Sequence, residues 1–344
     1  MRNFFRYLKE NQQFASKELI LIGNPLWKDL AVHYDGVLFD RFIWVSLPKY
    51  KNNLTYRIKT ILKLRALRLD TVMSLIHSRT NAHDELVLLS GAKEKWSSSG
   101  DAVNNSVHGK EINDRLFDKL IPTSNNLQFE FFRNKLLFEN LINEKINIER
   151  PFFKTDVVTE KKNWIGFFIG AADTFRKWST DNYIILAENL LKKFEHFQIV
   201  IFGGKGDMEN GVKIAEHLKT EKKIIDFTGK TGLTDLITLT ACCQLLITHD
   251  SAGLHIGAAV NVPAVCLSNG NHFGRFNPYP DLPGNKIRTI YPDESFYLPE
   301  NYYDYCKKYQ YISNMDINII TPEEVFETCL TLINTKQNTP KSQS

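Results

Sequence analysis

The second half of the chain alternates between short apolar runs and longer segments whose hydrophobic residues recur at helical spacing. An apolar run without alternation is typical of a strand that is buried on both faces of a sheet. The strand candidates are residues 163–170, 197–202, 223–227, 244–248 and 263–267. The helix candidates between them are residues 179–194, 208–219, 233–242 and 251–260. This strict alternation predicts an α/β domain with a parallel, doubly wound sheet.

The first half of the chain alternates in the same way, but less regularly. Its strand candidates are residues 18–23, 39–45 and 71–76, and residues 83–90 have the pattern of a helix. A charged, Asn-rich stretch and then Pro151 mark the end of this half, so we place the domain boundary near residues 148–162. We expect one domain over residues 1–150, a second over residues 151–335, and a disordered polar tail over residues 336–344.

A last helix is predicted to begin at Thr321, because residues 321–324 form a capping box with proline at the first helical position. This helix needs an apolar surface, and one option is that it packs back across the first domain. The length of 344 residues is large for a single core and agrees with two domains.

Composition and charge narrow the class of protein. The net charge of +4 is far below that of a typical nucleic-acid-binding protein. The sequence has neither the apolar stretch of about eighteen residues that a membrane span needs nor the apolar core of a secretory signal. The five cysteines show no metal-ligand or disulfide spacing, so we interpret them as reduced, buried thiols of a cytosolic protein.

The strongest chemical signal is the sequence THDSAGLHIGAA at residues 248–259, in which a strand end, a turn of small residues and a helix start follow one another. Residues 251–253 leave the first amides of the helix open, and these amides favour an anion such as a diphosphate. Asp250 would repel a bare phosphate, so it fits better as a partner for hydroxyls of a sugar on that phosphate. The alternatives are an ordinary helix cap and, for His255, an interior histidine.

Two more loops follow predicted strands. Arg176 and Lys177 stand beside Trp178, and the two cations could reach a phosphate at the carboxyl edge of the sheet, where open α/β sheets bind ligands. They could also be a solvated pair at a helix entrance, with Trp178 as a packing anchor. In the sequence FGGKGD at residues 202–207, the glycines permit close backbone approach and Asp207 could bind ribose hydroxyls. A plain glycine-rich turn is the alternative.

Several well-known signatures do not fit. Gly229, Lys230 and Thr231 suggest a phosphate-binding loop, but the required earlier glycine is Ile224. His249 and His255 have the wrong separation for a helical zinc site. The chain has no G-x-S-x-G nucleophile turn, and its glycines are too crowded for the dinucleotide fingerprint. A nicotinamide-dependent oxidoreductase is therefore disfavoured.

Together, these motifs resemble those of the family 9 glycosyltransferases, the heptosyltransferase-like enzymes of lipopolysaccharide assembly. The motifs occur in the family's order: Arg176-Lys177-Trp178, the glycine turn at residues 203–207, DFTGKTGL at residues 226–233, and DSAGLHIGAA at residues 250–259. The first half shows a weaker likeness, at residues 69–78 and 91–95. The sequence HFGRFNPY at residues 272–279 suggests a particular branch of the family.

The resemblance implies a GT-B fold, in which two Rossmann-like domains with parallel sheets face each other across a cleft and the donor binds mainly to the second. It implies inverting transfer of a heptose or hexose-like sugar from a nucleoside-diphosphate donor to a lipopolysaccharide or lipooligosaccharide core or a related glycan, without a metal or another cofactor. The donor contacts that it implies are Arg176, Lys177, Asp207, Thr228, Gly229, Asp250, Ser251, Ala252, Gly253 and His255, with Arg275 as a further contact to donor or acceptor. It also implies a cytoplasmic enzyme without a nucleic-acid partner, and it allows peripheral contact with the inner membrane.

The N-terminus departs from the family pattern. Family members open with a strand and a Gly-Asp turn whose Asp is the proposed general base, whereas residues 1–9 read as the helix after that turn. We therefore expect the first strand and this base to be missing, with Asp101 as a substitute candidate. A positioned base contributes about two to four orders of magnitude in rate. Two functions follow: an active transferase, or a catalytically impaired relative that binds the nucleotide sugar.

Overall fold

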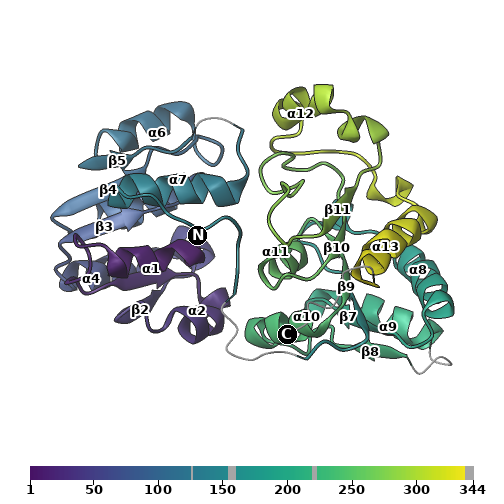
Figure 1. The fold of residues 1–344 in the computed structure, drawn as a ribbon. Coiled ribbons are helices and arrows are strands. Elements are labelled where there is room, and N and C mark those ends of the chain that lie inside the picture. Colours follow the sequence, from purple (N-terminus) through teal and green to yellow (C-terminus); the bar gives the residue numbers. More distant parts are fainter. Residues whose placement is uncertain (125–126, 154–159, 219–222, 338–344) are drawn as a thin grey trace. The chain divides into compact units, whose positions relative to one another are not determined.

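The computed structural model describes residues 1–124, 127–153, 160–218 and 223–337. The chain divides into two compact units, Met1–Ile148 and Glu149–Ser344 (Figure 1). Part of the predicted C-terminal tail, residues 338–344, lies outside the described residues, whereas residues 336 and 337 belong to the last helix.

The first unit is built from parallel strands with helices between them. Along the chain, its elements are α1 (Arg2–Glu10), β1 (Ile20–Gly23), η1 (Pro25–Trp27), α2 (Lys28–Asp35), β2 (Arg41–Trp44), α3 (Leu47–Asn52), α4 (Leu54–Ala66), β3 (Thr71–Ser74), α5 (Asn81–Leu88), β4 (Glu94–Ser98), α6 (Val107–Asp114), β5 (Lys119–Ile121) and α7 (Glu130–Ile142). The strands form two parallel sheets, in the orders β1-β2 and β3-β4-β5. The predicted strands and the helix at residues 83–90 are confirmed as β1, β2, β3 and α5, whereas β4 and β5 were not predicted.

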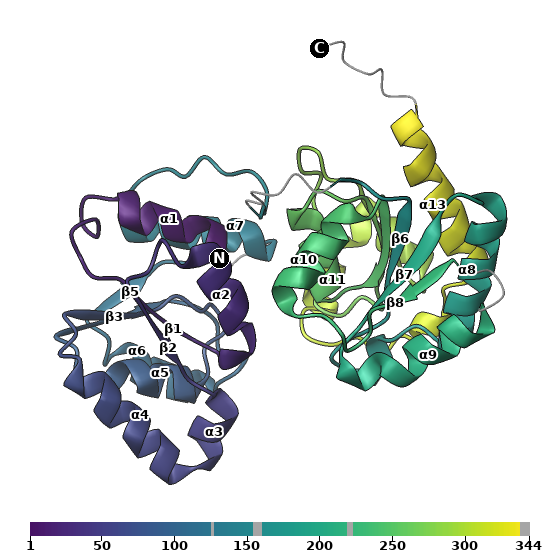
Figure 2. The same cartoon turned by 90° about the horizontal axis from the view of Figure 1, so that it is seen from below.

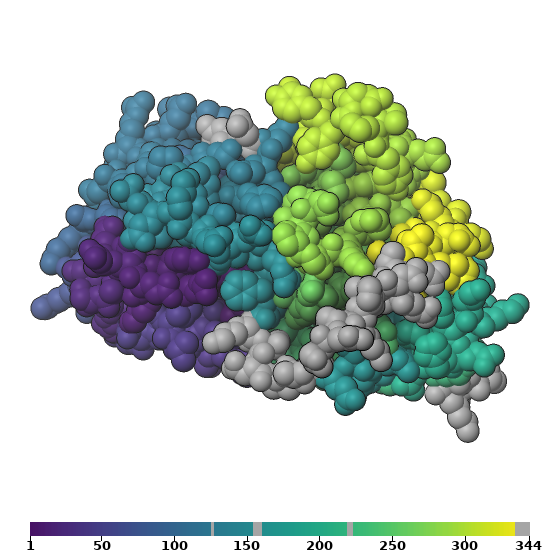
Figure 3. Space-filling view, in the orientation of Figure 1, coloured from purple at the N-terminus to yellow at the C-terminus, as the bar shows by residue number. Residues whose placement is uncertain are grey.

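The helix at the N-terminus is confirmed as α1, and it is amphipathic. Its apolar side buries Phe4 and Leu8, and the ring of Phe4 lies 5.2 Å from that of Phe131 and 5.5 Å from that of Phe138, both on α7. Its polar side forms part of the surface of the first unit, where it appears in purple in Figure 3. Aromatic packing between α1 and α7 therefore joins the two ends of this unit.

The second unit contains a single six-stranded parallel sheet in the order β11-β10-β9-β6-β7-β8. Its strands are β6 (Trp164–Phe168), β7 (Gln198–Phe202), β8 (Ile224–Asp226), β9 (Leu245–His249), β10 (Ala264–Leu267) and β11 (Ile287–Ile290). Its helices are η2 (Thr174–Arg176), α8 (Thr180–Lys193), η3 (Lys205–Asp207), α9 (Met208–His217), α10 (Leu233–Cys242), α11 (Ala252–Ala259), η5 (Glu294–Tyr297), η6 (Pro299–Asn301), α12 (Tyr302–Lys308), η7 (Ile317–Ile319) and α13 (Pro322–Gln337). The five predicted strands and the helices between them are confirmed; β11 was not predicted.

Both faces of this sheet are covered, which explains why its strands read as continuous apolar runs. On one face, Ile165 and Phe167 pack with the helices α8, α9 and α13. On the other face, Trp164 and Phe168 pack with α10 and α11. Figure 2 shows the two helical layers on opposite sides of the strands. The sheet is thus held rigid, with its carboxyl edge as the place where loops gather.

The last helix packs on the core of its own unit. Val325, Cys329 and Leu332 of α13 are buried in the cluster that also contains α8 and the sheet. Thr321 accepts the amide of Glu324 at 3.2 Å, so the predicted capping position is confirmed. The option that this helix packs across the first domain is wrong, because its apolar side is filled by β9, β10 and α8.

The burial predicted for the five cysteines is confirmed, and each is a free thiol in the structure. Within the described part of the chain, no helix combines the length and the apolar composition that crossing a membrane requires.

The packing of α11 against β6 predicts that a glycine on that helix cannot be enlarged. A Cβ atom at Gly253 would lie 2.5 Å from the ring of Phe168, which is itself packed on Phe202. Because overpacking of this kind costs about 1–3 kcal/mol, we expect Gly253→Ala to lower the free energy of unfolding despite the better helix propensity of alanine. Chemical denaturation measures this, with Gly206→Ala as the matched control, since a Cβ there meets no atom within 4 Å. Equal stabilities of the two variants would contradict the packing argument.

Candidate functional site

The strand order of the second unit places a switch point between β6 and β9. From β6 the chain proceeds through β7 to β8 on one side of the sheet, and from β9 through β10 to β11 on the other. In open α/β sheets, ligands bind outside the carboxyl ends of the strands at this point. The two loops that meet there follow β6 and β9, and they carry the sequence candidates Arg176 and Asp250.

Arg176 and Asp250 are joined by a direct hydrogen bond, although they are 74 residues apart. The guanidinium of Arg176 donates from Nη2 to the backbone carbonyl of Asp250. The Arg176 side chain is only 16% exposed, and its other terminal nitrogen lies 3.9 Å from the carboxylate of Asp173. The positive charge is thus anchored at the switch point and shielded from bulk water, where it acts more strongly than a surface charge.

The carboxyl group of Asp250 lies in an unfavourable place for a negative charge. The residue is 5% exposed, and its carboxylate makes no hydrogen bond or ion pair with any residue that the structure describes. Burial raises the pKa of Asp250 to about 6, although the charge of Arg176 opposes this rise. A buried carboxyl with a raised pKa is costly to the fold and is more common at functional sites than elsewhere.

The helix that follows Asp250 begins without a side-chain cap. Ser251 occupies the N-cap position of α11, and its hydroxyl makes no capping hydrogen bond. The first amides of a helix have no carbonyl of an earlier turn to bond. Ala252 is exposed and Gly253 is buried against Phe168, so small residues line this helix start. The open amides, the helix dipole and Arg176 together make a site that favours an anion.

The histidine before Asp250 has a structural role. The Nε2 atom of His249 accepts the backbone amide of Trp178 at 2.8 Å, so this nitrogen carries no proton. Burial lowers the pKa of His249 to about 4, which keeps the ring neutral at ordinary pH. Trp178 itself is buried and donates its indole N–H to the carbonyl of Ile320 at 2.8 Å. Its role as a packing anchor is therefore confirmed.

Lys177 and Asp207 bind each other. The ammonium of Lys177 lies 2.6 Å from Oδ1 of Asp207, and Oδ2 of Asp207 accepts the amide of Gly204 at 2.8 Å. A Cβ at Gly170 would lie 2.5 Å from the same carboxylate, so glycine is needed there for the loop to pass. Both residues lie at the carboxyl edge as the sequence indicates, but each is already engaged, which leaves Arg176 as the cation at the switch point.

The motif after β8 is a compact turn. Asp226 accepts both the amide and the hydroxyl of Thr228, at 2.8 and 2.7 Å, and Lys230 lies 3.2 Å from its other oxygen. Thr228 is completely buried, whereas Gly229 has a left-handed backbone with φ of 69°. The side chain of Thr228 thus holds the turn, Gly229 is half-buried, and the side chain of Lys230 is exposed.

The loop after β10 packs beside the start of α11. His255 bonds the hydroxyl of Tyr279 at 2.7 Å through Nδ1, and its ring lies 6.2 Å from that of Phe276. Burial, and then the charge of Arg176, lower the pKa of His255 to about 4. The charges of Arg275 and Arg176 both lower the pKa of His272, after the larger effect of burial. Two guanidinium groups therefore act on the same loop, which strengthens the preference for an anion.

In the first unit, the candidate Asp101 belongs to a small network at the carboxyl edge of the β3-β4-β5 sheet. Its Oδ2 accepts the hydroxyl of Ser78 at 3.0 Å and lies 3.3 Å from Nε2 of His77, and its Oδ1 accepts the amide of Val103 at 3.2 Å. Burial alone would raise the pKa of Asp101, but the hydrogen bond from His77 and those from Val103 and Ser78 bring it below its ordinary value. Asp101 is therefore ionised at neutral pH and is held in one orientation.

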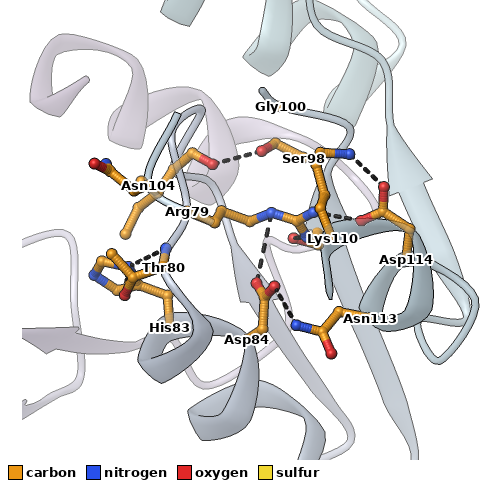
Figure 4. A network of polar contacts seen from close by, with 12 residues as sticks. Arg79, Thr80, His83, Asp84, Ser98, Gly100, Asn104, Lys110, Asn113 and Asp114 are labelled. Carbon is orange, nitrogen blue, oxygen red and sulfur yellow. Dashed lines mark hydrogen bonds and ion pairs between the residues drawn. The ribbon is translucent and has the colours of Figure 1, made fainter. Parts of the chain in front are cut away.

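The loop that carries His77 and Ser78 is fixed by a buried arginine. Arg79 is 1% exposed, and it lies between Asp84 on α5 and Asp114 on α6, as Figure 4 shows. Lys110 also binds Asp114, so the two carboxylates and the two cations balance in charge. A buried charge is tolerated when it is paired in this way. Sequence analysis included His77 within the family-like segment at residues 69–78 but gave it no role, and it missed Arg79, which lies just outside that segment.

No group of three or more metal-ligating side chains occurs in the ranges of the chain that the structure describes. The features at the switch point are instead those of an anion site.

Comparisons with known proteins find one family model and several relatives that are similar to part of the chain. A model of glycosyltransferase family 9 (heptosyltransferase) matches residues 138–292, which include Arg176, Asp250 and Arg275. The lipopolysaccharide heptosyltransferase 2 of Escherichia coli K12 is 34% identical over 113 residues, which are 32% of this chain and 32% of that protein. The chain thus matches about a third of the length of this curated relative.

Two solved structures share the fold along nearly the whole chain. The E. coli heptosyltransferase WaaC with ADP has a TM-score of 0.70 at 13% identity, over 96% of this chain and 94% of that chain. The E. coli ADP-heptose LPS heptosyltransferase II has a TM-score of 0.66 at 19% identity, over 98% and 95%. These likenesses confirm the GT-B class, with two Rossmann-like units. The family match extends over the anion site itself, so over residues 138–292 the chain is similar to glycosyltransferase family 9 (heptosyltransferase).

Proposed function

We propose that this protein transfers a sugar, a heptose or a hexose-like one, from a nucleoside-diphosphate donor to a lipopolysaccharide or lipooligosaccharide core or a related glycan. The observation that carries the proposal is the junction at the switch point, where Arg176 binds the carbonyl of Asp250 directly before an uncapped helix start. This arrangement suits a diphosphate, whose charge the guanidinium and the open amides would share.

The same groups suit the chemistry of transfer. When an acceptor hydroxyl attacks the anomeric carbon, the bond from that carbon to the diphosphate oxygen breaks and negative charge grows on the departing diphosphate. Fixed donors that already point at this position stabilise the charge without having to reorganise. Arg176 is held by Asp250 before any ligand arrives, so it meets this requirement. The reaction we propose is a single displacement, with inversion at the anomeric carbon.

Asp250 would contact the sugar rather than the phosphates. Its carboxyl group is buried beside the helix start and has no partner among the described residues, so sugar hydroxyls would supply the hydrogen bonds that it lacks. Protonation below a pH of about 6 removes the repulsion between this group and the diphosphate. Donor affinity is thereby linked to pH.

Asp101 is our candidate for the general base that takes the proton of the acceptor hydroxyl. It is ionised, partly exposed at 24% of its side chain, and oriented by His77, Ser78 and the amide of Val103. An oriented carboxylate needs no change of geometry before it accepts a proton. His77 positions Asp101 and is itself buried.

The first prediction of this proposal concerns donor binding. The solved relative WaaC contains ADP, so ADP and ADP-sugars are the first probes for this chain. A nucleotide at about 100 times its Kd should stabilise the protein by about 2.7 kcal/mol, measured as a thermal shift. Because Arg176→Ala removes a charge-assisted hydrogen bond, we expect the affinity to fall about tenfold to a hundredfold and most of the shift to disappear.

Arg288→Ala is the control for this experiment, because Arg288 is an exposed arginine on β11 that contacts only its neighbour's carbonyl among the hydrogen bonds described. It should keep the full shift. An unchanged shift in Arg176→Ala would show that the donor binds elsewhere. A normal shift without sugar transfer to any core acceptor would show a nucleotide-sugar-binding protein instead of a transferase.

The second prediction concerns pH. A nucleotide sugar keeps its charge between pH 5.5 and about 7.5, whereas Asp250 gains a proton as the pH falls through about 6. Binding should therefore strengthen on acidification, on the order of threefold to tenfold. When a nucleotide sugar is titrated calorimetrically into Asp250→Asn, its affinity should change much less with pH. Titration of His272 would account for any dependence that remains. His249 and His255 stay neutral in this range because their pKa values are about 4. An equally steep profile in Asp250→Asn would exclude Asp250 as the linked group.

The third prediction concerns the base. Asp101→Asn keeps the shape of the side chain but cannot accept a proton, so kcat for transfer should fall by about two to four orders of magnitude. The thermal shift with ADP should stay unchanged. Asp70→Asn, at a surface pair with Lys93, is the matched control and should keep its activity. If Asp101→Asn has the kcat of the wild type, Asp101 is not the general base. That result would not affect the proposed donor site.

A further inference from the structure

The first unit has an outer surface on which exposed apolar residues and unpaired cations stand together. It is formed by α3 and α4, which Figure 2 shows side by side at the lower edge of that unit. We call it the α4 outer face and define it by three apolar residues and six cations: Leu54, Ile58, Leu62, Lys49, Lys51, Lys59, Lys63, Arg65 and Arg68.

The apolar residues of the α4 outer face form one stripe. Leu54, Ile58 and Leu62 are four residues apart, so they lie above one another on one side of the helix. They are 69%, 47% and 60% exposed. The opposite side of α4 supplies the core contacts, through Leu64 at 0% and Thr60 at 9%. The helix is therefore apolar on two sides, of which only the inner one is covered by this unit.

The cations of the α4 outer face have no acidic counterparts on their own segment. Residues 46–69 contain seven lysines and arginines and no aspartate or glutamate. Arg57 is paired with Glu85 of the neighbouring helix α5. The other six make no ion pair with any residue in the described ranges. Because the whole chain carries a net charge of only +4, this segment is a strong local concentration of positive charge.

Cations flank the apolar stripe, and one lies on its own side of the helix. Lys59 and Lys63 each directly follow a stripe residue and therefore project about 100° further round the helix, whereas Arg65 is three residues after Leu62 and lies on the side of the stripe. A nucleic acid would use the cations but not the apolar stripe, and a partner surface that matched only the stripe would leave the cations unpaired. A bilayer with anionic headgroups uses both, since the apolar side chains enter the interface while the cations meet the phosphates.

We propose that the α4 outer face docks on an anionic lipid bilayer, with α4 lying in the plane of the interface. The side chains of Leu54, Ile58 and Leu62 enter the boundary between headgroups and acyl chains. Lysine and arginine side chains reach the surrounding phosphates along their flexible stems. This inference goes beyond the proposed sugar transfer and does not depend on it, because membrane binding can be measured without any nucleotide sugar.

Co-sedimentation with vesicles tests the proposal on the full chain. Vesicles of phosphatidylcholine and phosphatidylglycerol should bind the protein, and vesicles of phosphatidylcholine alone should bind it at least about tenfold more weakly. Binding should weaken as salt is raised, because ions screen the headgroup charge. Two variants should each reduce binding about tenfold: the triple change Leu54→Ser, Ile58→Ser and Leu62→Ser, and the charge reversal Lys59→Glu with Lys63→Glu.

A matched control carries the same kinds of change on a different helix. Ile185 is 41% exposed on α8, and Lys192 and Lys193 are exposed near the end of that helix. Ile185→Ser with Lys192→Glu and Lys193→Glu should bind vesicles as the wild type does. Circular dichroism and the temperature of thermal unfolding without nucleotide show that each variant is folded. The proposal is overturned if the wild type does not bind anionic vesicles or if the α4 variants bind them as the wild type does. It is also overturned if the control variant loses as much vesicle binding as the α4 variants.

Discussion

The hydrogen bond from Arg176 to the backbone carbonyl of Asp250 is the interaction on which the account of the site depends. It joins the loops after β6 and β9 at the point where the strand order reverses. Without it, the guanidinium would be one more mobile surface cation. With it, a positive charge is fixed beside an uncapped helix start, and the same charge shifts the pKa of Asp250, His249, His255 and His272.

The fold supports this junction through close packing at small residues. Gly253 lets α11 approach the ring of Phe168, and Gly170 lets the loop after β6 pass the carboxylate of Asp207. Lys177 neutralises that carboxylate, so the negative charge of Asp207 does not compete for Arg176. The burial of Asp250 opposes stability at neutral pH, since its raised pKa means that the folded state disfavours the ionised form. A buried carboxyl group that destabilises the protein in this way is more common at functional sites than elsewhere.

The sequence predicted the second unit well because its strands are apolar on both faces and are separated by clear helices. It did not reveal β4, since Ser97 and Ser98 are fully buried although they are polar, and hydropathy cannot show such burial. The candidate residues were also visible as motifs. Their connections were not: the bond between residues 176 and 250 requires the strand order, and the support of Asp101 by His77 requires the pairing of β3 with β4.

A crystal structure of the protein with bound ADP tests the central claim most directly. The account predicts pyrophosphate oxygens at hydrogen-bond distance, about 2.7–3.2 Å, from the first amides of α11 and from the guanidinium of Arg176. In the same complex, Arg176 should keep its contact with the carbonyl of Asp250. If the pyrophosphate is found at another edge of the sheet, and the hydroxyl of Ser251 caps the helix in its place, the account is contradicted.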